Sequence, residues 1–276
     1  RYYNPVSDQY KAKNGVVVAG TGGGKSFFIN YNIMSIMGYD PVIMIIDKGG
    51  SYKKLIETFG GEYFEVSAGY SINPFDVPLK QEEKGLYWKK VLELMVEDHE
   101  GKVSRHMRFI IEEVVRRIGV KGIKAPIPDD FVKESQKLNL SSELNLESDK
   151  LEEAKTDFII FLKMWTKGRK GDFVNNRNSE FDVSSDLMSI DLNKLKKYPE
   201  FYKIFMAWIS AVMWHKAEEN RSKITAFYFD EVWEVFASKQ GQELMDESYR
   251  TMRKYNGHLL SISQNIEDFE GNEYAK

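Results

Sequence analysis

The chain has 276 residues, of which 42% are hydrophobic and 29% are charged, and its formal net charge is −3. It contains no cysteine, which excludes disulfides and cysteine-ligated zinc and is compatible with a reducing compartment. The slightly acidic net charge gives no overall excess of positive charge that would indicate nucleic-acid binding. No apolar run approaches the roughly 20 residues that span a bilayer.

The first predicted elements are a β-branched strand over residues 15–19, a glycine-rich loop over 20–24 and an amphipathic helix over 27–37. This order of strand, loop and helix is what a phosphate-cradling P-loop requires. The alternative is a glycine-rich turn before an ordinary helix, and the agreement of all four parts, Lys25-Ser26 included, favours the P-loop. The pattern asks for glycine where this chain has Ala19, but alanine is small, so we expect the turn to survive.

The loop residues indicate phosphate chemistry. Consecutive glycines let the backbone curl so that its N–H groups converge on an anion, and the helix directs its positive end to the same place. Lys25 can reach the β- and γ-phosphates of a nucleotide, and the Ser26 hydroxyl can ligate Mg²⁺. The predicted nucleotide-binding residues are Thr21, Gly22, Gly23, Gly24, Lys25, Ser26 and Phe27.

Helical and stranded patterns then alternate, which favours a parallel sheet. Further strands are predicted over 42–46, 62–66, 187–192, 225–229 and 259–263, and helices over 201–217 and 240–255. Between 81 and 166 the patterns are helical, with breaks near 119–128 and 139–148, and 167–185 is polar and loop-like. We therefore expect an α/β nucleotide-binding domain over 1–80 and 181–276, interrupted by an all-helical subdomain over 81–180.

A second motif is the apolar strand that ends in Asp230 and Glu231. Asp230 would hold Mg²⁺, and Glu231 would polarise the attacking water as a general base. Taken alone, such a pair also fits the start of a helix, but its combination with the P-loop favours a hydrolase over a simple phosphotransferase.

Two further positions refine this site. Gln264 ends the last predicted strand, where its amide could contact the γ-phosphate or the lytic water, or simply lie in a polar loop. Arg250 and Arg253 lie near the end of a basic helix, where they either complement the helix dipole or act as an arginine finger in a neighbouring subunit.

Six motifs now occur in a recognisable order: GTGGGKS (20–26), DKGGSY (47–52), INPF (72–75), FYFDEVWEVF (227–236), RKYNG (253–257) and SISQ (261–264). Together they resemble the C-terminal ATPase domain of the TraC-type conjugation ATPases, the assembly ATPases of type IV secretion. These proteins belong to the HerA/FtsK superfamily of P-loop motors. The resemblance spans nearly the whole chain, from the P-loop to Gln264.

The resemblance implies a RecA-like sheet that binds ATP and Mg²⁺, with the helical region in the place of the family's all-α subdomain. It places Lys25 and Ser26 on phosphate and Mg²⁺, and Asp230 and Glu231 at the metal and the water. Gln264 becomes the sensor, and Arg253, which occupies the Arg-Lys position of its motif, becomes the expected finger. Because the chain starts with Arg1 shortly before the loop, we expect an N-terminal domain and a C-terminal tail outside it.

The expected function is Mg²⁺-dependent ATP hydrolysis that energises the assembly of, or transfer through, a type IV secretion or conjugation system. The expected partners are copies of the chain in a ring, which is a hexamer or a smaller ring, and other secretion subunits at the inner membrane. The expected place is cytoplasmic, peripheral at the cytoplasmic face of that membrane; DNA binding is not supported by the charge. Two alternatives stay open: a DNA-translocating or coupling motor of the HerA/FtsK type, and a mainly structural nucleotide-binding subunit.

Overall fold

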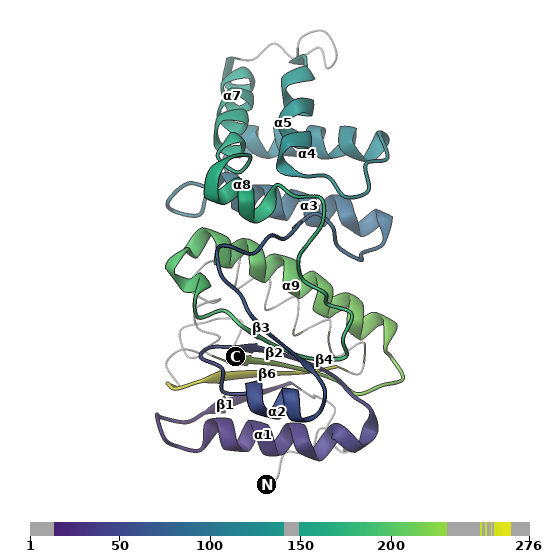
Figure 1. Cartoon of the computed structure of the whole chain (residues 1–276). Helices are drawn as coiled ribbons and strands as arrows, with labels where there is room; N and C mark the ends of the chain where they lie inside the picture. The colour runs from purple at the N-terminus through teal and green to yellow at the C-terminus, as the bar shows by residue number, and fades with distance from the viewer. Residues whose placement is uncertain are drawn as a thin grey trace. The chain divides into compact units, whose positions relative to one another are not determined.

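The computed structural model describes residues 14–140, 149–230 and 257–265, together with Tyr249, Met252 and Tyr255. The chain forms two compact units (Figure 1). Unit 1 takes its described residues from 1–67, 183–197 and 209–276, and unit 2 from 68–182 and 198–208. Helix α9 (Pro199–Glu219) contributes to both. Among the described residues, no helix combines the length and the apolar character needed to cross a membrane.

Unit 1 is built on a parallel sheet with the strand order β1-β6-β5-β2-β4-β3. Its strands are β1 (Gly15–Val18), β2 (Val42–Asp47), β3 (Glu62–Glu65), β4 (Leu187–Asp191), β5 (Thr225–Asp230) and β6 (Gly257–Ser263). All six predicted strands are present, and the predicted parallel α/β fold is confirmed. The central strand β2 is buried along its whole length, whereas the edge strand β1 alternates between partly buried and exposed residues.

One face of this sheet is covered by α1 (Lys25–Ile36) and α2 (Lys53–Thr58), which lie on the same side in Figure 1. Helix α1 is followed by a short 3-10 helix, η1 (Met37–Tyr39). Alternate strand residues meet the helices, because successive side chains of a strand point to opposite faces. The shared core is formed by Ile29, Ile33, Ile36, Ile43, Ile45, Tyr52, Ile56, Leu187, Ala226, Tyr228, Leu260 and Ile262.

The carboxyl ends of all the strands meet at one edge of the sheet, because the strands run parallel. The register aligns Asp47 with Asp191 and the end of β5 with the end of β6. The loops after β1, β2, β4 and β6 therefore open at the same edge, the usual place for ligands in open α/β sheets.

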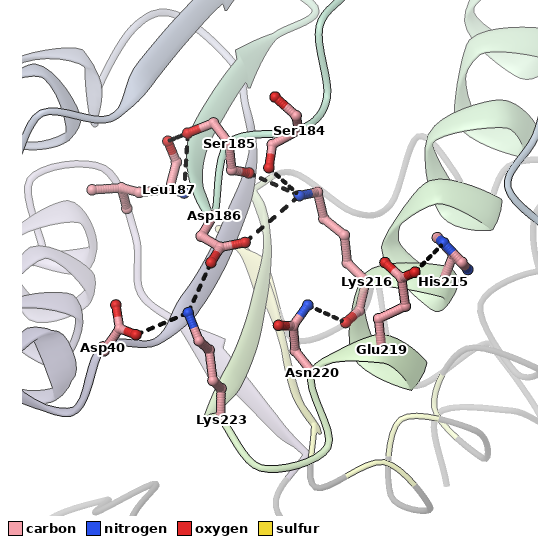
Figure 2. A network of polar contacts seen from close by, with 10 residues as sticks. All are labelled: Asp40, Ser184, Ser185, Asp186, Leu187, His215, Lys216, Glu219, Asn220 and Lys223. Atoms are coloured by element: carbon pink, nitrogen blue, oxygen red, sulfur yellow. Dashed lines mark hydrogen bonds and ion pairs between the residues drawn. The ribbon is translucent and has the colours of Figure 1, made fainter.

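The opposite, amino-terminal edge carries a polar network around two lysines (Figure 2). Lys216 of α9 is only 8% exposed, and its Nζ donates hydrogen bonds to the carbonyl oxygens of Ser184 at 3.0 Å and Ser185 at 2.9 Å. Lys223 pairs with Asp40 at 2.8 Å and with Asp186 at 3.0 Å. The network thus joins the segments that lead into β2, β4 and β5.

The described residues of unit 2 are helical in their regular structure and form an apolar core of their own. Its helices are α3 (Gln81–Val96), α4 (Arg105–Val120), α5 (Pro128–Lys137), α7 (Asp149–Lys163), α8 (Gly168–Val174) and the first part of α9. Helix α4 packs against α3, α5 and α7. Helix α4 buries one apolar stripe, and the buried rings of Phe75 and Trp88 each lie against the ring of Phe131.

The structure differs from the sequence-based expectation in two places. Residues 167–185 are not entirely loop, because 168–174 form α8. This helix is too short to show a period, and its formation follows from burial of Phe173, which stacks on Phe201 at 4.6 Å between ring centroids. Helix α2 is the second difference, since no pattern in the sequence predicts it. The predicted helix over 240–255 lies outside the described residues, apart from three single positions.

Candidate functional site

The loop between β1 and α1 has the backbone of an anion cradle. Gly22 and Gly24 adopt φ values of 77° and 81°, which favour glycine. A Cβ on Gly23 would lie 2.9 Å from the carbonyl oxygen of Gly20, and the Gly23 N–H donates to that same oxygen at 2.9 Å. The turn that the sequence predicts therefore depends on glycine at three successive positions.

Helix α1 begins at Lys25 with Gly24 as its N-cap residue. In the described part of the chain, no side chain caps this end and no acidic residue stands in its first turn. The positive end of the helix dipole, with no acidic side chain in the first turn, therefore favours a negatively charged partner at this end. Phe27, in the same turn, exposes 77% of its surface.

The P-loop lysine is paired with the aspartate that ends β5. Lys25 Nζ lies 3.1 Å from Asp230 Oδ1, and the two side chains are only 13% and 5% exposed. Two charges removed from water to this degree are stable only when each has an opposite charge or hydrogen bonds close by. The structure thus brings together the loop and the acidic strand end that the two sequence motifs marked separately.

The strand ends next to β5 carry two more buried aspartates. Asp47 ends β2 and Asp191 ends β4, and their side chains are nearly inaccessible to water. The pKa of Asp47 is raised to about 6, mainly by burial and also by the charges of Asp191 and Asp230, while the N–H groups of Lys48 and Tyr52 act in the opposite direction. Among the described residues, no group of three acidic, histidine or cysteine side chains is arranged to hold a metal ion.

Tyr52 links the loop after β2 to the P-loop. Its hydroxyl lies 3.4 Å from Asp230 Oδ2 and also hydrogen-bonds with Ser26. Burial, followed by the nearby charges of Asp230 and Asp47, raises the pKa of Tyr52 above its ordinary value, so the hydroxyl keeps its proton at neutral pH.

The remaining predicted residues divide into two groups. Gln264 follows β6, and its Oε1 accepts a hydrogen bond from the Thr21 hydroxyl at 2.9 Å, so it lies at the P-loop. Glu231, Arg250 and Arg253 lie outside the described residues.

Sequence reasoning missed Tyr52 and Asp191. One signal was available for Asp191, because the apolar strand 187–190 ends in an aspartate just as the strands before Asp47 and Asp230 do. Tyr52 ends the DKGGSY motif, but nothing near it in the sequence indicates its role, since its partner Asp230 lies far away along the chain.

Comparison with known proteins places this site in a family. The model of the TraG P-loop domain matches residues 3–276. TraC of Escherichia coli (strain K12) is 24% identical over 269 residues, which make up 94% of this chain and 30% of TraC. The chain therefore spans about a third of the length of that relative.

Two solved structures share the fold. VirB4 of Thermoanaerobacter pseudethanolicus matches with a TM-score of 0.76 at 20% identity, covering 98% of this chain and 75% of VirB4. The plasmid coupling protein TrwB, in complex with ADP and Mg²⁺, matches with a TM-score of 0.63 at 12% identity, covering 98% of this chain and 66% of TrwB. The resemblance to TraC-type conjugation ATPases is confirmed. With its P-loop, its parallel sheet and a family match over nearly all of its residues, the chain belongs to the TraG P-loop domain family.

Proposed function

We propose that this chain is the ATP-hydrolysing part of a type IV secretion or conjugation motor. The observation that carries the proposal is the 3.1 Å contact of Lys25 with Asp230, which joins the phosphate loop to the acidic end of β5. Family membership and the likeness to TraC and VirB4 support the same function. The chain matches only part of the length of these relatives. The activity of a whole secretion motor is therefore proposed here for the protein to which this chain belongs.

The loop fits the phosphates of a nucleotide. Its backbone leaves no room for a side chain at Gly23, and the first turn of α1 has no acidic residue to compete with an anion. Lys25 would exchange Asp230 for the β- and γ-phosphates, which releases the carboxylate for a cation. Thr21, Gly22, Gly24 and Phe27 complete the proposed binding set.

Hydrolysis then depends mainly on positioning. Ser26 and Asp230 would hold Mg²⁺, which when bound neutralises phosphate charge. Glu231 would take a proton from the attacking water, and Gln264, held at the loop through Thr21, would contact the γ-phosphate or that water. Arg253 would reach into the site of a neighbouring subunit as an arginine finger.

The wider arrangement is proposed from the family resemblance. The nucleotide-binding domain would comprise 1–80 and 181–276, and the all-α subdomain 81–180. Copies of the chain would form a ring, a hexamer or a smaller one, that works with other secretion subunits at the cytoplasmic face of the inner membrane.

Two variants test the site. Lys25→Ala should abolish ATP turnover, because the phosphates lose their neutralising charge. Glu231→Gln should still bind ATP but hydrolyse it at least about a hundredfold more slowly, since proton abstraction contributes roughly that much. Phosphate release and retained nucleotide are measured on the full-length protein. Undiminished hydrolysis by Glu231→Gln would remove Glu231 from the role of base.

The same assay separates the alternatives. Hydrolysis stimulated by added DNA would favour a DNA-translocating or coupling motor. Tight nucleotide binding with negligible turnover in the assembled ring would favour a structural subunit. Turnover that rises with protein concentration and ignores DNA is the result expected for the secretion ATPase.

A further inference from the structure

The hydroxyl of Tyr52 lies between two residues of the proposed magnesium site. It is within 3.4 Å of Asp230 Oδ2 and hydrogen-bonds with Ser26. The carboxylate of Asp230, paired with Lys25, has no proton to give, so Tyr52 must donate there. The phenol has a single proton, and Ser26 is therefore the donor in the other bond. The hydrogen bonds run in one direction, from Ser26 through Tyr52 to Asp230.

The loop after β2 holds this ring in place. Asp47 Oδ2 accepts the backbone N–H of Tyr52 at 3.4 Å, and Asp191 Oδ1 accepts that of Gly49 at 3.2 Å. Gly49 and Gly50 adopt φ values of 103° and 73°, so the sharp turn needs both glycines. Two buried carboxylates on neighbouring strands thus fix the backbone on either side of the turn that delivers Tyr52.

Packing alone does not account for a tyrosine at this position. The ring is fully buried, and a phenylalanine would fill the same space without a polar atom to satisfy. A buried hydroxyl is costly unless it is hydrogen-bonded, and here both partners are residues of the proposed site. Lys25 contacts Oδ1 of Asp230, whereas Tyr52 contacts Oδ2. When Lys25 turns to a nucleotide, Tyr52 would still hold the carboxylate in its orientation.

We propose that Tyr52 is a positioning residue of the magnesium site, whose hydroxyl fixes the oxygen atoms of Ser26 and Asp230 relative to each other. The inference rests on the proposed function, in which these two residues hold the ion. The same role explains the DKGGSY motif. Asp47 and the two glycines shape the turn that positions Tyr52, and the Tyr52 hydroxyl contacts the residues proposed to hold the metal ion.

The test is the Tyr52→Phe variant of the full-length protein, which removes one oxygen atom and keeps the ring. Calorimetry measures the affinity for ADP with Mg²⁺ and with EDTA. We expect the affinity in EDTA to be unchanged and the gain on adding Mg²⁺ to fall by about tenfold, as for other partners that orient metal ligands. ATP turnover should then need a correspondingly higher Mg²⁺ concentration.

Tyr63→Phe is the matched control. The Tyr63 hydroxyl also donates to a buried aspartate at a strand end, Asp191, at 3.0 Å, but Tyr63 contacts neither Ser26 nor Asp230. This variant should keep the wild-type gain from Mg²⁺. In a Ser26→Ala background, Tyr52→Phe should lower the gain by a smaller factor than in the wild type, because only the contact with Asp230 is then left to lose.

Each result bears on a different claim. A Tyr52→Phe protein that loses ADP affinity equally in Mg²⁺ and in EDTA, or that keeps the full gain, overturns the positioning role and leaves the proposed function standing. Wild-type protein that binds ADP no better with Mg²⁺ than with EDTA overturns the magnesium site itself, and the role of Tyr52 with it.

Discussion

At the scale of single residues, the carboxyl group of Asp47 makes the stability of the fold depend on pH. Its pKa is about 6 in the folded chain, against an ordinary value of 3.8. Between these values the folded chain holds more protons than the unfolded chain, so the free energy of unfolding falls as the pH rises. The full effect of the raised pKa is about 3 kcal/mol.

Asp47→Asn should remove this dependence. Asparagine keeps only one acceptor for the two N–H groups of Lys48 and Tyr52, which shifts the free energy of unfolding by a constant amount at every pH. The variant should therefore gain stability relative to wild type as the pH rises from 4 to 7, by up to about 3 kcal/mol. Urea unfolding at several pH values measures the difference. A difference that stays constant over this range would contradict the raised pKa.

At this scale the sequence predicts part of the candidate site, and it misses the rest for a physical reason. Lys25, Ser26 and Asp230 belong to motifs in which neighbouring residues serve one function, so each could be found locally. Tyr52 and Asp191 act through contacts with distant segments. Such contacts depend on the register of the strands, which no short stretch of residues specifies.

At the scale of elements, the buried lysine of α9 ties the helix to the segment that leads into β4. Lys216→Met should lower the free energy of unfolding by about 2 kcal/mol, because two carbonyl oxygens lose a charged donor in a site closed to water. Nucleotide affinity should not change, since the network lies at the edge of the sheet opposite the P-loop. Urea unfolding and ADP binding measure the two effects.

Lys223→Met serves as the comparison in the same network. This lysine forms ion pairs with Asp40 and Asp186. All three of these side chains are more exposed to water than the side chain of Lys216. Its loss should cost less than about 1 kcal/mol, as for other exposed ion pairs. Equal costs for the two variants would mean that burial does not set the strength of this network.

The strands were easier to predict than the short helices. Strand β2 is a run of apolar residues between a proline and a glycine-rich turn, and such runs are typical of parallel strands buried on both faces. Helices α2 and α8 have six and seven residues, less than two full turns, so neither repeats its apolar positions. Their stability comes from burial of Ile56 and Phe173 against distant segments.

At the scale of the whole molecule, an arginine finger from a neighbouring subunit would make ATP turnover depend on assembly of the ring. Lys25→Ala subunits would keep Arg253, and Arg253→Ala subunits would keep the P-loop. Mixing the two inactive proteins should therefore restore activity, at most to about a quarter of the wild-type value for random equal mixing in a cyclic ring. Steady-state ATP hydrolysis across mixing ratios measures the effect.

A second mixture controls for the first. Lys25 and Glu231 both serve the ATP site of their own subunit. A mixture of Lys25→Ala subunits with Glu231→Gln subunits therefore contains no intact site, and mixing should restore no activity. If the mixture with Arg253→Ala is also inactive at every ratio, Arg253 does not act across a subunit boundary.

The sequence predicted a parallel sheet but not the order of its strands. Hydrophobic runs mark each strand separately, whereas β1 pairs with β6, at the far end of the described chain. That choice depends on how helices and loops cross the sheet, which is a property of the complete fold.

The pairing of β1 with β6 has a consequence for biosynthesis. The described strands give β1 one neighbour in the sheet, β6, which is also the last strand in sequence. During translation the glycine-rich loop leaves the ribosome before residues 257–263, and its supporting strand gains its hydrogen-bonded partner β6 only after those residues have emerged. Thr21 meets Gln264 at the same late stage. The contacts that hold the loop against β6 and Gln264 therefore form only after residues 257–264 have been made, so the complete surroundings of the loop are a late product of translation.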